Sequence, residues 1–294
     1  MLLIFRFIFT NALTMSVWLV DAKFVRKDVI MSGMKCGGDW QQGGVFVYDD
    51  EVAQKRPLIG YAHGWTDGGH FLDVYYQKLW PLLVEAGYVI IAQKAPDGWY
   101  YCEFEYEDQL RAIEWAKNGS EVVEHIDLDT PVSLAGHSMG GLSVVLASSQ
   151  SDRIKALNIG AAVAQHPSVN VDGCPKCAPL VPIMFTTGDE DVKVPPKYVR
   201  AQYDATEGVP KSFVEMKGAG HLDPKTGEDL QGNYVLDWLN CFIKNSSSAC
   251  MLSRCNEPQQ TSPTSACTNE GVPSFVNVIV KSTTYLPLRL PPLG

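Results

Sequence analysis

Short apolar runs and longer amphipathic segments alternate along the chain between about residues 45 and 245. The runs are rich in β-branched residues, and the segments between them repeat apolar positions at helical spacing. This alternation is typical of βα units stacked on a mostly parallel sheet. We expect strands over residues 44–48, 57–62, 88–92, 131–135, 156–163, 181–186 and 211–216, and helices over 73–85, 105–117, 139–149, 196–206 and 228–244.

The two ends of the chain depart from this pattern. The first 22 residues form an interrupted apolar stretch that ends on Ala22, which favours a secretory signal peptide over a membrane span. Beyond residue 245, Ser, Pro and scattered Cys dominate, and the chain closes on a Leu-Pro-rich stretch. We therefore expect a signal peptide over 1–22, one main domain over 23–245 and a Cys/Pro-rich C-terminal extension over 246–294, in which 274–282 could add an edge strand.

Composition narrows the classes of partner. The 294 residues include 24 Lys and Arg against 33 Asp and Glu, a formal charge of -9, and no basic block could neutralise a row of phosphates. We therefore expect no nucleic-acid partner. We also expect no stable membrane span and a monomeric protein.

Cysteine usage agrees with secretion. All eight cysteines follow the expected signal peptide, so four disulfides are possible. The crowding of cysteines at positions 241, 250, 255 and 267 predicts that at least one bridge ties the tail to the last helix. Cys174 and Cys177 lie in a Pro-containing loop, which favours a structural disulfide over a redox motif or half of a zinc site.

A candidate nucleophile stands at the turn between an expected strand and a small apolar helix. Ser138 lies in Gly136-His137-Ser138-Met139-Gly140, and glycines flank it at two residues on either side. A sharp strand-to-helix turn holds such a serine in strained geometry, and small neighbours let strand and helix approach closely. A chance GxSxG in an ordinary turn is the alternative, and the surrounding strand and helix argue against it.

A serine nucleophile needs a base and an orienting carboxylate, in the chain order Ser, acid, His. Two histidines follow Ser138, and we expect His221 to be the base, because it lies in a Gly-rich loop past the last strand. The loop after residue 187 offers Asp189, Glu190 and Asp191; we choose Asp191, with Asp189 as the alternative. A solvated acidic loop or a calcium site would not explain why these carboxylates fall between serine and histidine.

Backbone amides should stabilise the oxyanion. We expect the N–H of Met139 and, from the loop after an earlier strand, the N–H of Trp65 to supply them. His63 in that loop is expected to bond the loop backbone. Trp65 and Trp99 lie in or near loops on the ligand side of such a sheet, so either could contact substrate, although Trp99 could equally shield the core.

These motifs together resemble the dienelactone-hydrolase-like group that contains cutinases active on polyesters and chlorophyllases. The matching segments are HGW at 63–65, GHSMGG at 136–141, GDEDVKVP at 188–195 and GAGH at 218–221. The resemblance implies an α/β-hydrolase fold, with Asp191 as acid, His221 as base and the amides of Trp65 and Met139 as oxyanion donors. It also places His166 among the substrate contacts. The residues at 137, 139 and 166 differ from one or other of these relatives.

The sequence therefore predicts a secreted serine ester hydrolase, cutinase-like, acting on a small or polymeric ester without metal or cofactor. A chlorophyllase or lipid-type esterase is the alternative within the class. From other classes we keep a ligand-binding homologue without catalysis and an acyl transferase.

Overall fold

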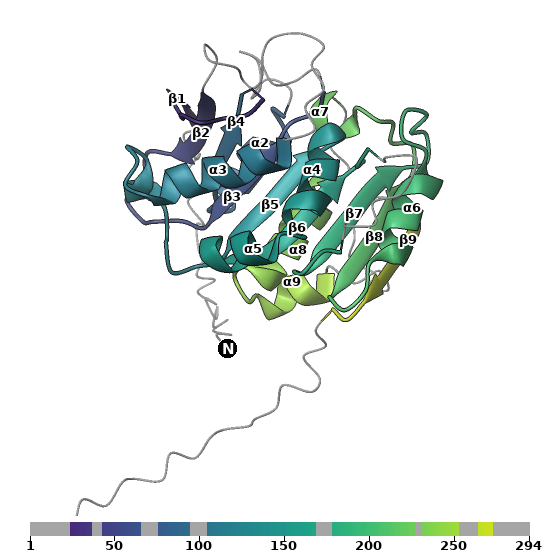
Figure 1. Cartoon of the computed structure of the whole chain (residues 1–294). Coiled ribbons are helices and arrows are strands. Elements are labelled where there is room, and N and C mark those ends of the chain that lie inside the picture. The colour runs from purple at the N-terminus through teal and green to yellow at the C-terminus, as the bar shows by residue number, and fades with distance from the viewer. Residues whose placement is uncertain are drawn as a thin grey trace, which may run out of the picture.

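The computed structural model describes residues 24–36, 43–65, 76–94, 105–168, 178–226, 231–252 and 264–272. One nine-stranded sheet runs through these residues, in the order β1-β2-β4-β3-β5-β6-β7-β8-β9 (Figure 1). Its strands are β1 (Phe24–Val29), β2 (Gly44–Asp49), β3 (Leu58–Ala62), β4 (Val89–Gln93), β5 (Val132–His137), β6 (Ile159–Gln165), β7 (Ile183–Gly188), β8 (Lys211–Met216) and β9 (Thr264–Glu270). The strands from β4 through β3 and β5 to β8 are parallel, whereas β1, β2 and β9 pair antiparallel.

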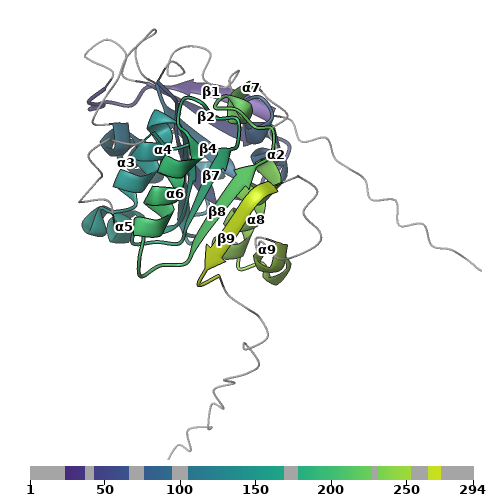
Figure 2. The ribbon, with the colours of Figure 1, turned by 90° about the vertical axis from the view of Figure 1, so that its right-hand side faces the viewer.

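Helices cover both faces of the sheet. They are α2 (Leu79–Glu85), α3 (Glu105–Lys117), α4 (Met139–Ala147), α5 (Ser151–Leu157), α6 (Pro196–Ala205), α7 (Asp223–Thr226), α8 (Gly232–Phe242) and α9 (Ser247–Leu252), with a 3-10 turn at Val123–His125. Seen along the sheet, α3 to α6 lie on one side, and α2, α8 and α9 lie on the other (Figure 2). This is the α/β-hydrolase fold that the sequence predicted.

The central strands are buried on both faces, as their nearly continuous apolar sequences require. One apolar cluster joins the sheet to α3, α4 and α6, and contains Leu110, Val144 and Val199. The other joins it to α2 and α8 through Trp80 and Trp238. The two clusters fix the sheet between its helices, so the loops at the strand ends start from rigid positions.

One expected strand begins later in the structure than the sequence predicted. The expected strand over 156–163 begins later, because α5 continues to Leu157 and Asn158 ends it in the left-handed conformation, at φ 55°. Among the described elements, β1, α5, α7, α9, β9 and the 3-10 turn were not predicted. The edge strand considered for 274–282 lies outside the described residues.

The central sheet includes a strand from beyond residue 245. Strand β9 pairs with β8 from Lys211↔Glu270 to Met216↔Thr264, so part of the expected extension is the outermost strand of the central sheet. A disulfide between Cys241 and Cys250 ties α8 to α9, which confirms the expected bridge between the last long helix and the tail. Cys36 and Cys267 are also disulfide-bonded, whereas Cys174 and Cys177 lie outside the described residues.

None of the described helices has the length and apolar character that crossing a bilayer requires. The expected signal peptide over 1–22 lies outside the described residues.

Candidate active site

Ser138 occupies a strained turn between β5 and α4. Its backbone has φ 60° and ψ -114°, a region that non-glycine residues rarely adopt. A Cβ on Gly136 would lie 2.5 Å from the carbonyl oxygen of Gly140, and a Cβ on Gly140 would overlap the backbone of Ala62. The expected combination of a strained serine and two small neighbours is therefore confirmed.

His221 and Asp191 meet Ser138 from the loops after β8 and β7. The Nε2 atom of His221 lies 2.9 Å from Ser138 Oγ, and its Nδ1 atom lies 2.8 Å from Asp191 Oδ2. Because Nδ1 donates to a carboxylate, Nε2 is left as the acceptor that faces the serine hydroxyl. The three side chains thus form one continuous line of hydrogen bonds.

Asp191 is buried and strongly hydrogen-bonded. Its Oδ1 atom accepts the backbone N–H groups of Lys193 and Val194, at 2.9 and 2.8 Å, and its Oδ2 atom accepts from the rings of His166 and His221. Burial by itself would raise the pKa of the Asp191 carboxyl, but these donors outweigh burial and hold the pKa well below its usual range. Asp191 is therefore ionised throughout the neutral range.

Asp189, the alternative acid, has another partner. Its Oδ1 atom accepts the backbone N–H of Gly218 at 2.7 Å, at an exposed position. The contact joins the loop after β7 to the loop that carries His221, but the described hydrogen bonds of the His221 ring go to Asp191 and Ser138. The geometry thus favours Asp191.

His166 does not lie where a substrate contact should be. Its ring is completely buried, and Nδ1 lies 2.7 Å from Asp191 Oδ2, on the same oxygen that His221 uses. Burial lowers the pKa of His166, although Asp191 partly opposes this effect. The resemblance placed His166 among the substrate contacts, and the structure contradicts this, because an enclosed ring bonded to Asp191 cannot touch a bound ester.

The two expected oxyanion donors lie on adjacent segments. Met139 is the first residue of α4, where backbone N–H groups lack partners within the helix. Trp65 follows β3, whose end packs against Gly140, and its side chain is 46% exposed. The expected substrate contact Trp99 lies outside the described residues.

Two other histidines support the backbone. His63 Nδ1 lies 2.7 Å from the carbonyl oxygen of Gly64, which confirms its expected bond to the loop. His137, buried beside the serine, donates from Nε2 to the carbonyl oxygen of His221 at 2.8 Å. The His221 segment is therefore held from the strand that precedes Ser138.

No ligand set for a metal was expected from the sequence, yet His166, Asp191 and His221 bring possible ligand atoms within 4.8 Å of one another. In the structure both Nδ1 atoms point at the same carboxylate oxygen, at hydrogen-bond distance. An ion between them would have to displace the two N–H protons that make these bonds. The three residues do not fit a resident metal, and we assign none.

The sequence analysis did not identify the buried polar residues that bond to His166 or to its partner. Gln231, fully buried immediately before α8, places Nε2 against His166 Nε2, and its Oε1 atom accepts from the Thr186 hydroxyl. Gln165 joins them, with Nε2 3.4 Å from Gln231 Oε1. The only sequence signal is Gln165-His166 at the end of an otherwise apolar strand, where polar residues must find partners once buried.

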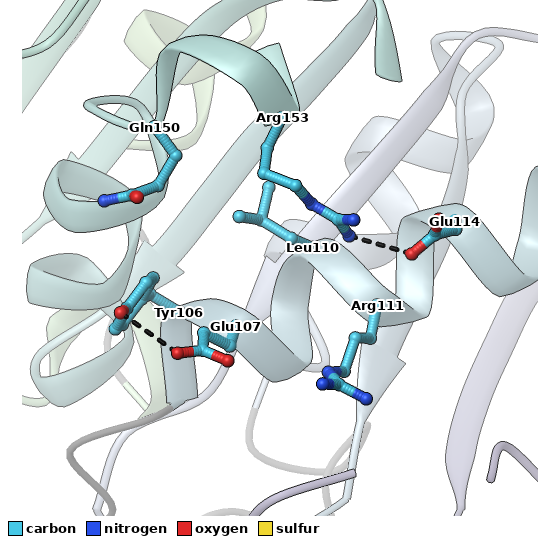
Figure 3. Close-up of a pocket in the computed structure, with 7 residues that line it drawn as sticks. All are labelled: Tyr106, Glu107, Leu110, Arg111, Glu114, Gln150 and Arg153. Atoms are coloured by element: carbon cyan, nitrogen blue, oxygen red, sulfur yellow. Dashed lines mark hydrogen bonds and ion pairs between the residues drawn. The ribbon is translucent and has the colours of Figure 1, made fainter. Parts of the chain in front are cut away.

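A pocket of about 350 Å³ lies elsewhere, between α3 and the start of α5 (Figure 3). Its lining includes Tyr106, Arg111 and Gln150, and Arg153 pairs with Glu114 at 2.9 Å across it. The lining contains none of the residues around Ser138. This pocket is therefore separate from the candidate active site.

Comparison with known proteins gives one family. The family described as PETase, PET hydrolase-like, matches residues 43–271, a range that starts just before β2 and includes β9. No curated protein matches the chain.

Proposed function

Because the chain belongs to the PET hydrolase-like family, and is thus an ester hydrolase of the cutinase and polyester-hydrolase type, we propose that it cleaves esters through an acyl-enzyme on Ser138. The observation that carries the proposal is the hydrogen-bonded line from Ser138 Oγ through His221 to Asp191. The resemblance to cutinases active on polyesters agrees with this family.

In the first half-reaction, Ser138 Oγ attacks the ester carbonyl carbon while His221 Nε2 takes the hydroxyl proton. The carbon–oxygen bond to the alcohol then breaks, and the same proton passes from His221 to the leaving oxygen. In the second half-reaction, water attacks the acyl carbon by the same route and releases the acid and free Ser138. Asp191 stays ionised throughout and stabilises the charged His221 ring.

The tetrahedral oxyanion forms beside the first turn of α4. The amides of Met139 and Trp65 are the proposed donors, and the positive end of the α4 dipole adds to them. Support comes from the close packing of the β3 end against Gly140, which brings the two segments together.

Exposed apolar side chains suit an ester that is part of an apolar surface. Two of them neighbour site residues in the chain, namely Val192 beside Asp191 at 85% exposure and Leu222 beside His221 at 50%. A third is the proposed oxyanion residue Trp65 itself, at 46%. Exposed apolar groups around a reactive centre are typical of surfaces that bind apolar partners. We therefore favour an insoluble polyester substrate over a soluble ester, with chlorophyll and long-chain lipids as the competing apolar substrates.

The test of the reaction compares wild type and Ser138→Ala on p-nitrophenyl butyrate. We expect the substitution to abolish the burst of p-nitrophenol and lower kcat by about 10⁴-fold or more. Equal rates would refute the acyl-enzyme and favour a binding protein without catalysis. Added alcohol that diverts the acyl group into a new ester would instead indicate an acyl transferase.

The test of the substrate uses a panel of short esters, long-chain lipids, chlorophyll and polyester films. Leu222→Ser should lower film hydrolysis more than hydrolysis of the soluble ester. Leu180→Ser is the matched control, because Leu180 is 48% exposed but bonds through its N–H to Ser148, at the far end of α4. Equal effects of the two variants on the film would contradict the proposed apolar surface.

We also propose that the protein is secreted as a monomer. The apolar stretch over 1–22 and the disulfide between Cys241 and Cys250 support secretion. The amino terminus of the protein recovered from the medium tests this, since cleavage after Ala22 would leave Lys23 first. Retention of residues 1–22 in the cell membrane would contradict it.

A further inference from the structure

The carboxylate of Asp191 is shared by two histidines. Its Oδ2 atom lies 2.8 Å from Nδ1 of His221, the proposed base, and 2.7 Å from Nδ1 of His166. The ring of His166 is 0% exposed and takes no part in the line from Asp191 to Ser138. Asp191 therefore has a second, buried imidazole partner besides the proposed base.

The partners of His166 fix which of its nitrogen atoms carries the proton. Tyr61 donates its hydroxyl to Gln165 Oε1 at 3.0 Å, which turns the Gln165 amide group toward Gln231 Oε1. The Thr186 hydroxyl also donates to Gln231 Oε1. With its oxygen occupied by donors, Gln231 presents its N–H to Nε2 of His166, so that Nε2 accepts and Nδ1 carries the proton toward Asp191.

The backbone at His166 is strained, and its neighbours hold it in place. Its φ of 44° lies in the left-handed region, which β-carbon-bearing residues adopt only where the surroundings enforce it. The N–H of His166 donates to the Thr186 carbonyl at 2.8 Å, and that of Ser168 donates to the Ser138 carbonyl at 2.8 Å. In this turn the imidazole is buried and bonds to Asp191.

We propose that His166 is a positioning residue, which holds Asp191 through the same carboxylate oxygen that His221 uses and is itself held in one neutral tautomer by Gln231. This proposal rests on the proposed function, because it assigns His166 a role in the reaction of Ser138. Two backbone N–H groups already occupy Asp191 Oδ1, so the carboxylate accepts four donors and cannot rotate. Its negative charge is divided among those donors, which limits how strongly it stabilises the protonated ring of His221.

The ionisable groups that face His166 are few among the described residues. Asp191 comes from the loop after β7, the ring of His221 lies 5.8 Å away, and the ring of His137 on β5 lies 5.9 Å away. Gln231, immediately before α8, and Thr186 on β7 are neutral. Removal of the His166 donor therefore acts chiefly on Asp191 and, through it, on His221.

The decisive substitution is His166→Leu, which removes the donor at similar volume. We expect kcat to fall by about tenfold, as Asp191 gains freedom, and the acidic limb of the kcat/KM profile to move up by about half a pH unit. The sign follows because a less satisfied carboxylate holds the proton on His221 more tightly. His166→Asn returns an N–H donor near the position of Nδ1 and tolerates positive φ, so it should restore both values.

A second variant avoids the strained position. Gln231 has φ -88°, so Gln231→Met removes the amide without backbone strain. It should shift the acidic limb in the same direction by a smaller amount, because the His166 ring is then free to exchange tautomers. If both variants lower kcat but leave the limb of the profile in place, His166 serves only packing and the proposal is wrong.

Proton NMR of the full-length protein, labelled with ¹⁵N-histidine, tests the arrangement without reference to activity. We expect two protected imidazole N–H protons on Asp191, from His166 and His221, and loss of one in His166→Leu. A His166 protonated on Nε2 in the wild type would overturn the proposal. Failure of the proposed function, in contrast, would be seen as unchanged hydrolysis by Ser138→Ala with both N–H signals intact.

Discussion

Gly188→Ala would place a methyl group between the loops that carry Asp191 and His221. The added Cβ would lie 2.5 Å from the carbonyl carbon of Ala219 and 2.7 Å from its Cβ. Because carbon atoms pack best at about 3.5 Å or more, the Ala219 segment must withdraw by about 1 Å. That movement would pull His221 from Asp191 and Ser138, to which it is bonded at 2.8 and 2.9 Å.

We expect kcat/KM of Gly188→Ala on p-nitrophenyl butyrate to fall by about 100-fold, since a misplacement of about 1 Å can cost two orders of magnitude. Its free energy of unfolding should fall by about 1–3 kcal/mol, measured by urea denaturation. Gly220→Ala is the matched control in the same loop, because its nearest neighbour to a Cβ is the Glu190 carbonyl oxygen at 4.0 Å. The reasoning fails if the two variants keep kcat/KM values within about twofold of each other.

Asp191→Asn should lower kcat by about 10⁴-fold, because an amide can present N–H to His221 and favour the wrong tautomer, whereas Asp189→Asn should stay within about tenfold of wild type. Burial raises the pKa of Asp237 to about 6. Between about pH 4 and 6 the folded state therefore binds more protons than the unfolded state, so the free energy of unfolding should fall as pH rises through that window. Asp237→Asn should then raise the melting temperature at pH 7 but not at pH 4; equal effects at both would contradict this origin. Replacing Cys241 and Cys250 by Ala should cost about 2–3 kcal/mol in urea denaturation and leave kcat on the soluble ester unchanged.

The parts of the fold that the sequence predicted are those with strong local signals. The helix over 105–117 was predicted to the residue, because apolar positions repeat at helical spacing and Asn118-Gly119 follows. The edge strands β1 and β9 were missed, since charged residues interrupt the apolar ones in FVRKDV and most residues of TSACTNE are polar. An edge strand is held by backbone pairing with one neighbour, and that pairing leaves little trace in the hydrophobic pattern.

The candidate site likewise contains residues that the sequence could identify and residues that it could not. The order of Ser138, Asp191 and His221 along the chain follows from the connectivity of the fold, so reasoning from motifs could select them. The position of His166 depends on a left-handed turn after β6 and on Gln231, which is 65 residues away in the sequence. No local sequence pattern indicates such a contact. The His166 ring, which was expected to face substrate, is instead buried and bonded to Asp191.

Reaction type and substrate preference reside in different atoms of this site. Glycines lock the reactive loops together by backbone contact: Gly140 against Ala62, Gly141 against Pro167 and Gly188 against Ala219. Any added side chain at these contacts moves the nucleophile, base or acid, so it should slow hydrolysis of every ester alike. The exposed side chains of Val192 and Leu222 make none of these contacts, so their replacement should change the ranking of esters while the chemical step persists. A relative that keeps the interlocked glycines but differs at these exposed positions should therefore share the reaction without sharing the substrate.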